Sequence, residues 1–176
     1  WKRDPECAIC YWGEGWAWGS YLNAPMTGEE SPHAYAAAQK ALSLKSRATP
    51  KERALIDALA VRYVEKFDGA RRVEQDRAYA EAMQKVSAQY PDDLEIATLY
   101  ADALFLLEPR RGTRDIKSES VQRLHRVLER ILAKDVHHPG ACHLSIHATE
   151  STVVPGKAED CAEFLMKSIP GASHIN

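Results

Sequence analysis

The stretch VQRLHRVLERILAKDVHHPGACHLSIHATE, residues 121–150, decides the fold class. Its first half places apolar residues three and four positions apart, which is the spacing of one face of an α-helix. A polar turn with Pro139 follows, and a second helical pattern then begins. Proline suits the first turn of a helix because the N–H group that it lacks would have no partner there. The stretch therefore predicts two helices joined by a short turn.

The same arrangement recurs along the chain. Prolines with similar surroundings stand at five candidate helix starts: Pro5, Pro50, Pro91, Pro139 and Pro170. The intervals between them run from 31 residues (139 to 170) to 48 residues (91 to 139), which fits helix-turn-helix units with loops of varying length. No segment alternates convincingly between apolar and polar residues, so we expect an all-α protein. Its architecture is predicted to be an α-solenoid of about four helical hairpins.

The expected helices can be placed by residue number. First helices are predicted over 7–20, 51–64, 92–107 and 140–151, and second helices over 35–45, 76–90, 121–135 and 158–170. These give units 5–48, 49–90, 91–138 and 139–169, with the start of a further unit at 170–176, in a single domain over 1–176. Because no starting Met or leader is visible, we expect a fragment of a longer chain.

Residues 11–19, YWGEGWAWG, resemble the W-x-x-L-G-x-x-Y stretch of a tetratricopeptide first helix. Trp12 and Gly13 stand where Leu-Gly is usual in that family, and Trp16 stands where Tyr is usual. The following ALSL helix resembles the second half of the same repeat, and Pro91 and Pro139 match the proline that introduces the next repeat. The resemblance implies a TPR-like α-solenoid that binds or scaffolds other proteins. More narrowly, DPECAICYWGE, NAPM at 23–26 and HPGACHLSIHATE resemble a bacterial group of tetratricopeptide-type proteins.

Composition excludes several classes of partner. With 176 residues, of which 45% are hydrophobic, the chain can bury a sizeable core. Its 23 basic residues are scattered among 25 acidic ones, which predicts no nucleic-acid partner. The longest apolar run, 101–107, is far short of the roughly 20 residues that a membrane span needs, so a soluble chain is expected. The mixed-sign runs at 51–57 and 71–77 are interpreted as solvated helix faces.

Histidines on the predicted helix at 140–151 form the first candidate site. His143 and His147 are four residues apart and Glu150 follows on the same stripe, an arrangement that suits a divalent transition metal. His174 occupies the equivalent place in the next predicted unit and is a candidate third ligand. The favoured interpretation is that these histidines are structural, and metal or substrate binding is the alternative. His137 and His138, just before Pro139, are expected to be solvated.

The cysteines allow several interpretations. Cys7 and Cys10 could form half of a metal site, a redox pair, or two small apolar residues on a helix. We expect the four thiols, with Cys142 and Cys161, to be buried and structural. The pair is compatible with reducing and oxidising surroundings alike, so the compartment stays open.

Aromatic residues near the start of the chain form the second candidate site. Trp12 and Trp16 lie four residues apart, with Tyr11 beside them, and we expect them to pack against a neighbouring helix. The alternative is an aromatic groove for a peptide or carbohydrate, covered by the loop at 23–32.

Two functional hypotheses follow. No nucleophile constellation or phosphate loop is present, so no catalytic residues are predicted. The favoured hypothesis is a helical-repeat scaffold that binds protein, including itself, because uncovered end units would stack head to tail into an oligomer or filament. The competing hypothesis is a metalloprotein or metal-dependent enzyme centred on the histidine stripe.

Overall fold

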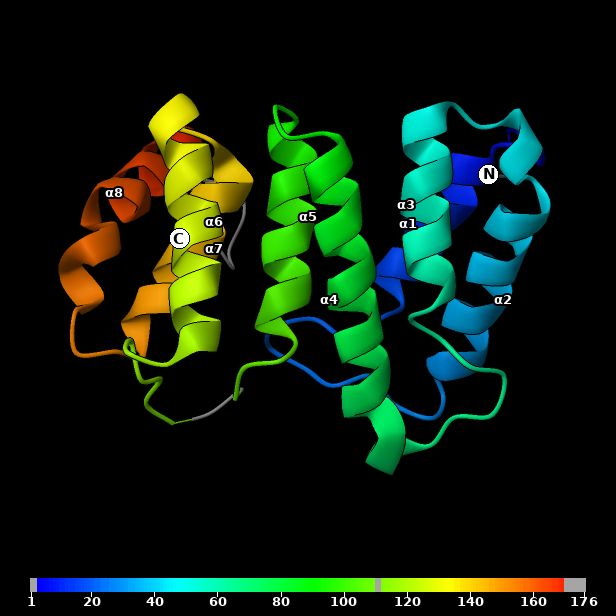
Figure 1. The fold of residues 1–176 in the computed structure, drawn as a ribbon, viewed down its shortest axis with the longest axis horizontal. Coiled ribbons are helices and arrows are strands. Elements are labelled where there is room, and N and C mark those ends of the chain that lie inside the picture. Colours follow the sequence, from blue (N-terminus) through cyan, green and yellow to red (C-terminus); the bar gives the residue numbers. More distant parts are fainter. Residues whose placement is uncertain (1–2, 110–111, 170–176) are drawn as a thin grey trace. The chain divides into compact units, whose positions relative to one another are not determined.

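The computed structural model describes residues 3–109 and 112–169, and its α-helices confirm the all-α expectation (Figure 1). No β-strand occurs in these two ranges. Each α-helix falls on an expected segment. The helices are α1 (Ala8–Ala17), α2 (Ser31–Ser43), α3 (Pro50–Ala60), α4 (Arg72–Gln89), α5 (Leu94–Phe105), α6 (Glu119–Lys134), α7 (Pro139–Glu150) and α8 (Glu159–Ser168), with short 3-10 helices η1 (Lys45–Arg47), η2 (Gly69–Arg71) and η3 (Pro155–Ala158).

The chain divides into two compact units, Trp1–Tyr90 and Pro91–Asn176, which we call unit 1 and unit 2. In unit 1, α1 packs on α2 and α3 on α4, and α3 also contacts both α1 and α2. Unit 2 repeats this scheme, because α5 packs on α6 and α7 on α8, while α7 also contacts α5 and α6. The division falls at Pro91, where the third hairpin was predicted to begin. A single domain over the whole chain stays a prediction.

Local chemistry explains where the helices start. Pro50 and Pro139 occupy the first positions of α3 and α7, as predicted. Thr49 and Glu52 form a reciprocal capping box at α3, so that two backbone N–H groups of its first turn gain side-chain acceptors. At α5 the side chain of the N-cap residue Asp93 accepts a hydrogen bond from the N–H of Ile96. These caps set the helix starts more closely than the prolines alone.

Small residues allow the helices of unit 1 to approach closely. Ala34, Ala38 and Ala41 on α2 are almost fully buried. On the facing helix, a Cβ added at Gly15 would lie 3.2 Å from the backbone nitrogen of Ala38. Packing at this separation gains dispersion contacts that larger side chains would prevent. The core of unit 2 combines buried small side chains, such as Ala101 and Ala141, with branched ones, among them Ile96, Leu124, Ile131 and Leu165.

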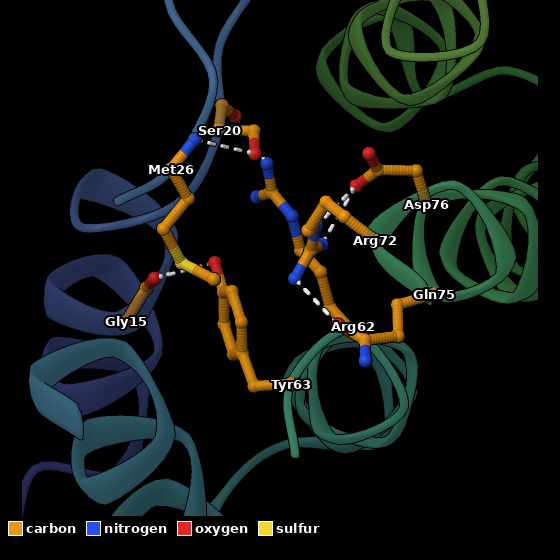
Figure 2. A network of polar contacts seen from close by, with 8 residues as sticks. All are labelled: Gly15, Ser20, Met26, Arg62, Tyr63, Arg72, Gln75 and Asp76. Atoms are coloured by element: carbon orange, nitrogen blue, oxygen red, sulfur yellow. Dashed lines mark hydrogen bonds and ion pairs between the residues drawn. The ribbon is translucent and has the colours of Figure 1, made fainter. Parts of the chain in front are cut away.

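A buried polar network fastens the loop after α1 to the rest of unit 1 (Figure 2). The side chain of Arg62 is fully buried and donates a hydrogen bond to the backbone carbonyl of Ser20. The guanidinium also lies 4.7 Å from the centroid of the Tyr79 ring. Beside it, the buried pair of Arg72 and Asp76 is joined at 2.6 Å. The expectation that the run at 71–77 is a solvated face is therefore wrong for these two residues.

Candidate functional site

The start of α7 orients the histidine stripe. His138 is the N-cap residue, and its Nδ1 accepts a hydrogen bond from the backbone N–H of Ala141 at 3.2 Å. The His138 side chain is buried, so the expectation that it is solvated is wrong. Its Nδ1 serves as the acceptor of the helix cap instead of bonding to water. His137 is exposed, and its ring stacks on Phe164 at a centroid distance of 4.4 Å.

Three of the four predicted metal-site residues come together on α7. The Nε2 atoms of His143 and His147 are 3.1 Å apart, and Nδ1 of His147 lies 2.7 Å from Oε1 of Glu150. Both histidines are half-buried, with 14% of the His147 side chain exposed, whereas Glu150 is about half exposed. His174 lies outside the described residues. The helical spacing therefore produces the predicted cluster of two imidazoles and a carboxylate.

The positions of the hydrogen bonds assign a role to each ring nitrogen. Because Glu150 accepts at Nδ1 of His147, the neutral His147 ring carries its proton on Nδ1 and leaves Nε2 as an acceptor. His143 then donates from its own Nε2. The three side chains form a chain of hydrogen bonds in which a single proton separates two imidazole nitrogens.

The same two nitrogens have the separation that a shared metal ion requires. With metal–nitrogen bonds of about 2.0–2.1 Å, nitrogens 3.1 Å apart subtend roughly 100° at the ion. That angle lies between the octahedral and tetrahedral values of about 90° and 109°. Glu150 contacts the opposite nitrogen of His147, so it suits an orienting carboxylate rather than a ligand. No group of three or more His, Cys, Asp or Glu residues placed to hold a metal is found within 3–109 and 112–169.

A residue that sequence reasoning missed, Arg114, supports the end of this helix. Its side chain is buried, and it donates to the backbone carbonyl of His147 at 2.9 Å and to that of Pro109 at 3.2 Å. Its backbone N–H donates to the carbonyl of Ser151 at 2.8 Å. A cation near the last turn of a helix satisfies carbonyls that lack partners in the helix itself. Arg114 lies 33 residues before His147, and no local signal links the two.

Comparison with known proteins adds no family to this description. No protein-family model, curated protein or solved structure matches the chain. The tetratricopeptide resemblance and the metal site therefore rest on the residues of this chain alone.

The predicted aromatic site divides into a packed part and an exposed part. Tyr11 and Trp12 pack against the buried cluster of Ala8, Ala41, Ala48 and Ile56. The indole N–H of Trp12 donates to the carbonyl of Leu55 at 3.1 Å. These contacts agree with packing as the role of Tyr11 and Trp12. Trp16, which stacks on Trp12 at 6.4 Å between ring centroids, is 36% exposed.

The cysteines are paired, so the expectation of four structural thiols is wrong. Cys7 and Cys10 form one disulfide at the start of α1, with their Cα atoms 5.3 Å apart. Cys142 on α7 and Cys161 on α8 form the second, with Cα atoms 4.8 Å apart. The second pairing depends on how two helices pack, which explains why sequence spacing did not indicate it.

His125 on α6 is a further titratable residue that sequence reasoning missed. It lines a cavity of about 240 Å³ between α6, α7 and the segment from Lys157 to Cys161. Burial lowers the pKa of His125 below its ordinary value, and the nearby Lys157 ammonium lowers it further. Its ring is therefore held neutral at physiological pH.

Proposed function

We propose that this chain binds a divalent transition metal ion between His143 and His147. The observation that carries the proposal is the 3.1 Å separation of the two Nε2 atoms. A metal ion would take the place of the proton between them, and His143 would then carry its proton on Nδ1, so that both rings bind as neutral imidazoles. Solvent or a group from elsewhere would complete the coordination. Two neutral imidazoles suit Zn²⁺, Ni²⁺ or Cu²⁺ better than they suit the oxygen-seeking Mg²⁺ and Ca²⁺.

Two features of the surroundings favour this role. Both histidines project from one helix whose first and last turns are held by His138 and Arg114, so the backbone that carries the two ligands is ordered before an ion binds. Glu150 fixes the His147 ring so that Nε2 is the nitrogen without a proton, which is the form that binds a metal.

The arrangement supports binding rather than catalysis. A general base of the Glu–His type acts on a hydroxyl or thiol nucleophile held at the far ring nitrogen. Here the hydrogen bond at Nε2 of His147 goes to His143, which does not serve as such a nucleophile. We therefore propose that the three residues hold an ion and do not form a hydrolytic site.

Elemental analysis of the purified protein, without an affinity tag that contains histidine, tests this proposal. Dialysis against Zn²⁺ followed by a metal-free wash should leave about one ion per chain. The variant His143→Ala plus His147→Ala should retain none, because both nitrogen ligands are removed. The control His33→Ala plus His137→Ala removes two exposed histidines outside the stripe and should retain the ion. Equal metal contents in all three proteins would refute the site.

We propose self-association as a second role, consistent with a tetratricopeptide-like solenoid. Two observations favour it: within each unit the helices contact one another in the order expected of stacked hairpins, and Trp16, Trp18 and Tyr21 are 36–54% exposed. Exposed aromatic side chains of this size are enriched at protein interfaces.

Light scattering over a range of concentrations tests the second role. The mass of the protein should rise with concentration, and Trp16→Ala plus Trp18→Ala should suppress the rise. The control Val153→Ala changes an exposed side chain in unit 2 and should leave the rise intact. A monomeric mass at every concentration would refute self-association.

A further inference from the structure

The two disulfides differ in what they connect. Cys142 and Cys161 are buried and join two helices across 19 positions of sequence. Cys7 and Cys10 are half-buried and three positions apart, with Cys7 just before α1 and Cys10 in its first turn. Access by a thiol to a sulfur atom controls the rate of disulfide exchange, so the first pair is the one open to exchange.

The Cys7–Cys10 bond contributes little to stability as a cross-link. The stabilisation that a disulfide provides grows with the length of the loop that it closes. The Cys7–Cys10 bond spans 3 positions, whereas the Cys142–Cys161 bond spans 19. The backbone of the same turn is already held, because the N–H groups of Cys10 and Tyr11 both donate to the carbonyl of Cys7. The fold of α1 therefore has other support when the bond is open.

The start of α1 also suits the reduced form of Cys7. Cys7 is the N-cap residue of α1, where no side chain caps the helix and no acidic residue lies in the first turn. A thiolate on Cys7 would lie where a capping acceptor normally lies, and the helix N-terminus stabilises a negative charge there. Glu6, the acidic residue next to Cys7, forms an ion pair with Arg47, which offsets its charge.

We propose that Cys7 and Cys10 are a redox-active pair that exchanges with a dithiol reductant, while the Cys142–Cys161 disulfide stays closed. A thiolate of the reductant bonds to Sγ of Cys10, the Cys7–Cys10 bond breaks, and its electron pair leaves on Cys7. The second thiol of the reductant then attacks the reductant's own sulfur in this mixed disulfide and releases Cys10. The protein gains two electrons and two protons, and the reductant becomes a disulfide.

Titration with dithiothreitol redox buffers tests the proposal, with each cysteine followed by alkylation and peptide mass spectrometry. Cys7 and Cys10 should become alkylated together along a two-electron curve, at a reductant ratio at least about tenfold below that needed for Cys142 and Cys161. The helical circular dichroism should not change over that range, and removing the reductant should restore the same pair. Simultaneous reduction of both pairs, or loss of helix when Cys7–Cys10 opens, would overturn it.

Single-cysteine variants test the part played by the helix terminus. Cys10→Ser leaves Cys7 as a thiol at the N-cap, and Cys7→Ser leaves Cys10 as the matched control. The pH dependence of alkylation should place the pKa of Cys7 below the ordinary value of about 8.5 and below that of Cys10. A Cys7 pKa at or above both values would remove the stabilisation on which the proposed exchange depends.

Discussion

Gly19 lies where the loop after α1 passes over the side chains of Arg62 and Tyr63, which follow the end of α3. A Cβ at this position would overlap the hydroxyl of Tyr63 and would lie 2.8 Å from Cζ of Arg62. Both side chains are buried, Arg62 in the polar network and Tyr63 beside it, where its hydroxyl donates to the carbonyl of Gly15 at 2.8 Å, so neither can easily move. Only glycine, which has no Cβ, therefore allows the loop to lie against Arg62 and Tyr63 at this position.

Gly19→Ala should destabilise unit 1 by about 1–3 kcal/mol, because the added methyl group forces two buried side chains apart. Urea unfolding followed by tryptophan fluorescence measures this, since all four tryptophans precede Gly19 in the sequence. Gly13→Ala is the matched control: Gly13 lies within α1 with nothing within 4 Å of the added Cβ, so alanine should stabilise by up to about 1 kcal/mol. Equal effects of the two variants would contradict this account of Gly19.

His125 should make the stability depend on pH. Its folded-state pKa lies below the ordinary value of 6.5, so the unfolded chain binds the proton more readily. The residue costs no stability well above pH 6.5, and it destabilises the fold as the pH falls through 6.5 toward the folded-state pKa. Between about pH 7.5 and pH 5.5, urea unfolding should show a smaller loss of stability for His125→Gln than for the unchanged protein. Identical losses would show that His125 is not responsible.

At this scale, sequence reasoning succeeded where contacts are local. His143, His147 and Glu150 meet because helical geometry places residues three and four positions apart side by side. It failed for contacts made by tertiary packing, such as the Cys142–Cys161 disulfide and the bonds of Arg114. It also failed for His138, because the residues that bury a cap come from elsewhere in the fold.

At the scale of secondary structure, the eight α-helices of residues 3–109 and 112–169 could be predicted because each carries apolar residues at helical spacing and follows a turn. The ends were less well predicted. The first helix was expected over 7–20, but α1 ends at Ala17. Arg62 donates to the carbonyl of Ser20 in the loop beyond it, and Tyr63 donates to the carbonyl of Gly15 in the last turn of α1, contacts that no local pattern indicates. Tertiary contacts, rather than helix propensity, terminate this helix.

The capping box of α3 gives a prediction at this scale. Thr49→Ala removes the side-chain acceptor for the N–H of Glu52 and should cost about 1 kcal/mol of stability in urea unfolding. Ser46→Ala, at an exposed position of the preceding turn, should cost much less. An equal effect of both substitutions would show that the cap does not stabilise α3.

At the scale of the whole molecule, the division between units 1 and 2 falls at Pro91, one of the prolines at which a hairpin was predicted to begin. The spacing of the prolines did not indicate that the chain divides there rather than at Pro50 or Pro139. Within the described ranges, no helix is long and apolar enough to cross a membrane. The solenoid arrangement stays a proposal, because the spacing of helices predicts neighbours but not how successive hairpins are rotated. That rotation depends on side-chain packing between them.

Metal binding should raise the free energy of unfolding. Zn²⁺ at about one hundred times its dissociation constant should raise the free energy of unfolding of unit 2 by about 2.7 kcal/mol, because the ion binds the paired histidines of the folded helix. Thermal unfolding followed by circular dichroism measures this rise. The His143→Ala plus His147→Ala variant should show none, and a comparable rise in that variant would place the binding elsewhere.

Calorimetric titration of the tag-free protein with Zn²⁺ tests the metal site most directly. We predict one ion per chain, no measurable binding by His143→Ala or His147→Ala, and an affinity reduced about tenfold by Glu150→Gln, because that carboxylate orients a ligand without being one. Binding that survives the loss of either histidine, or no binding by the unchanged protein, would contradict the account.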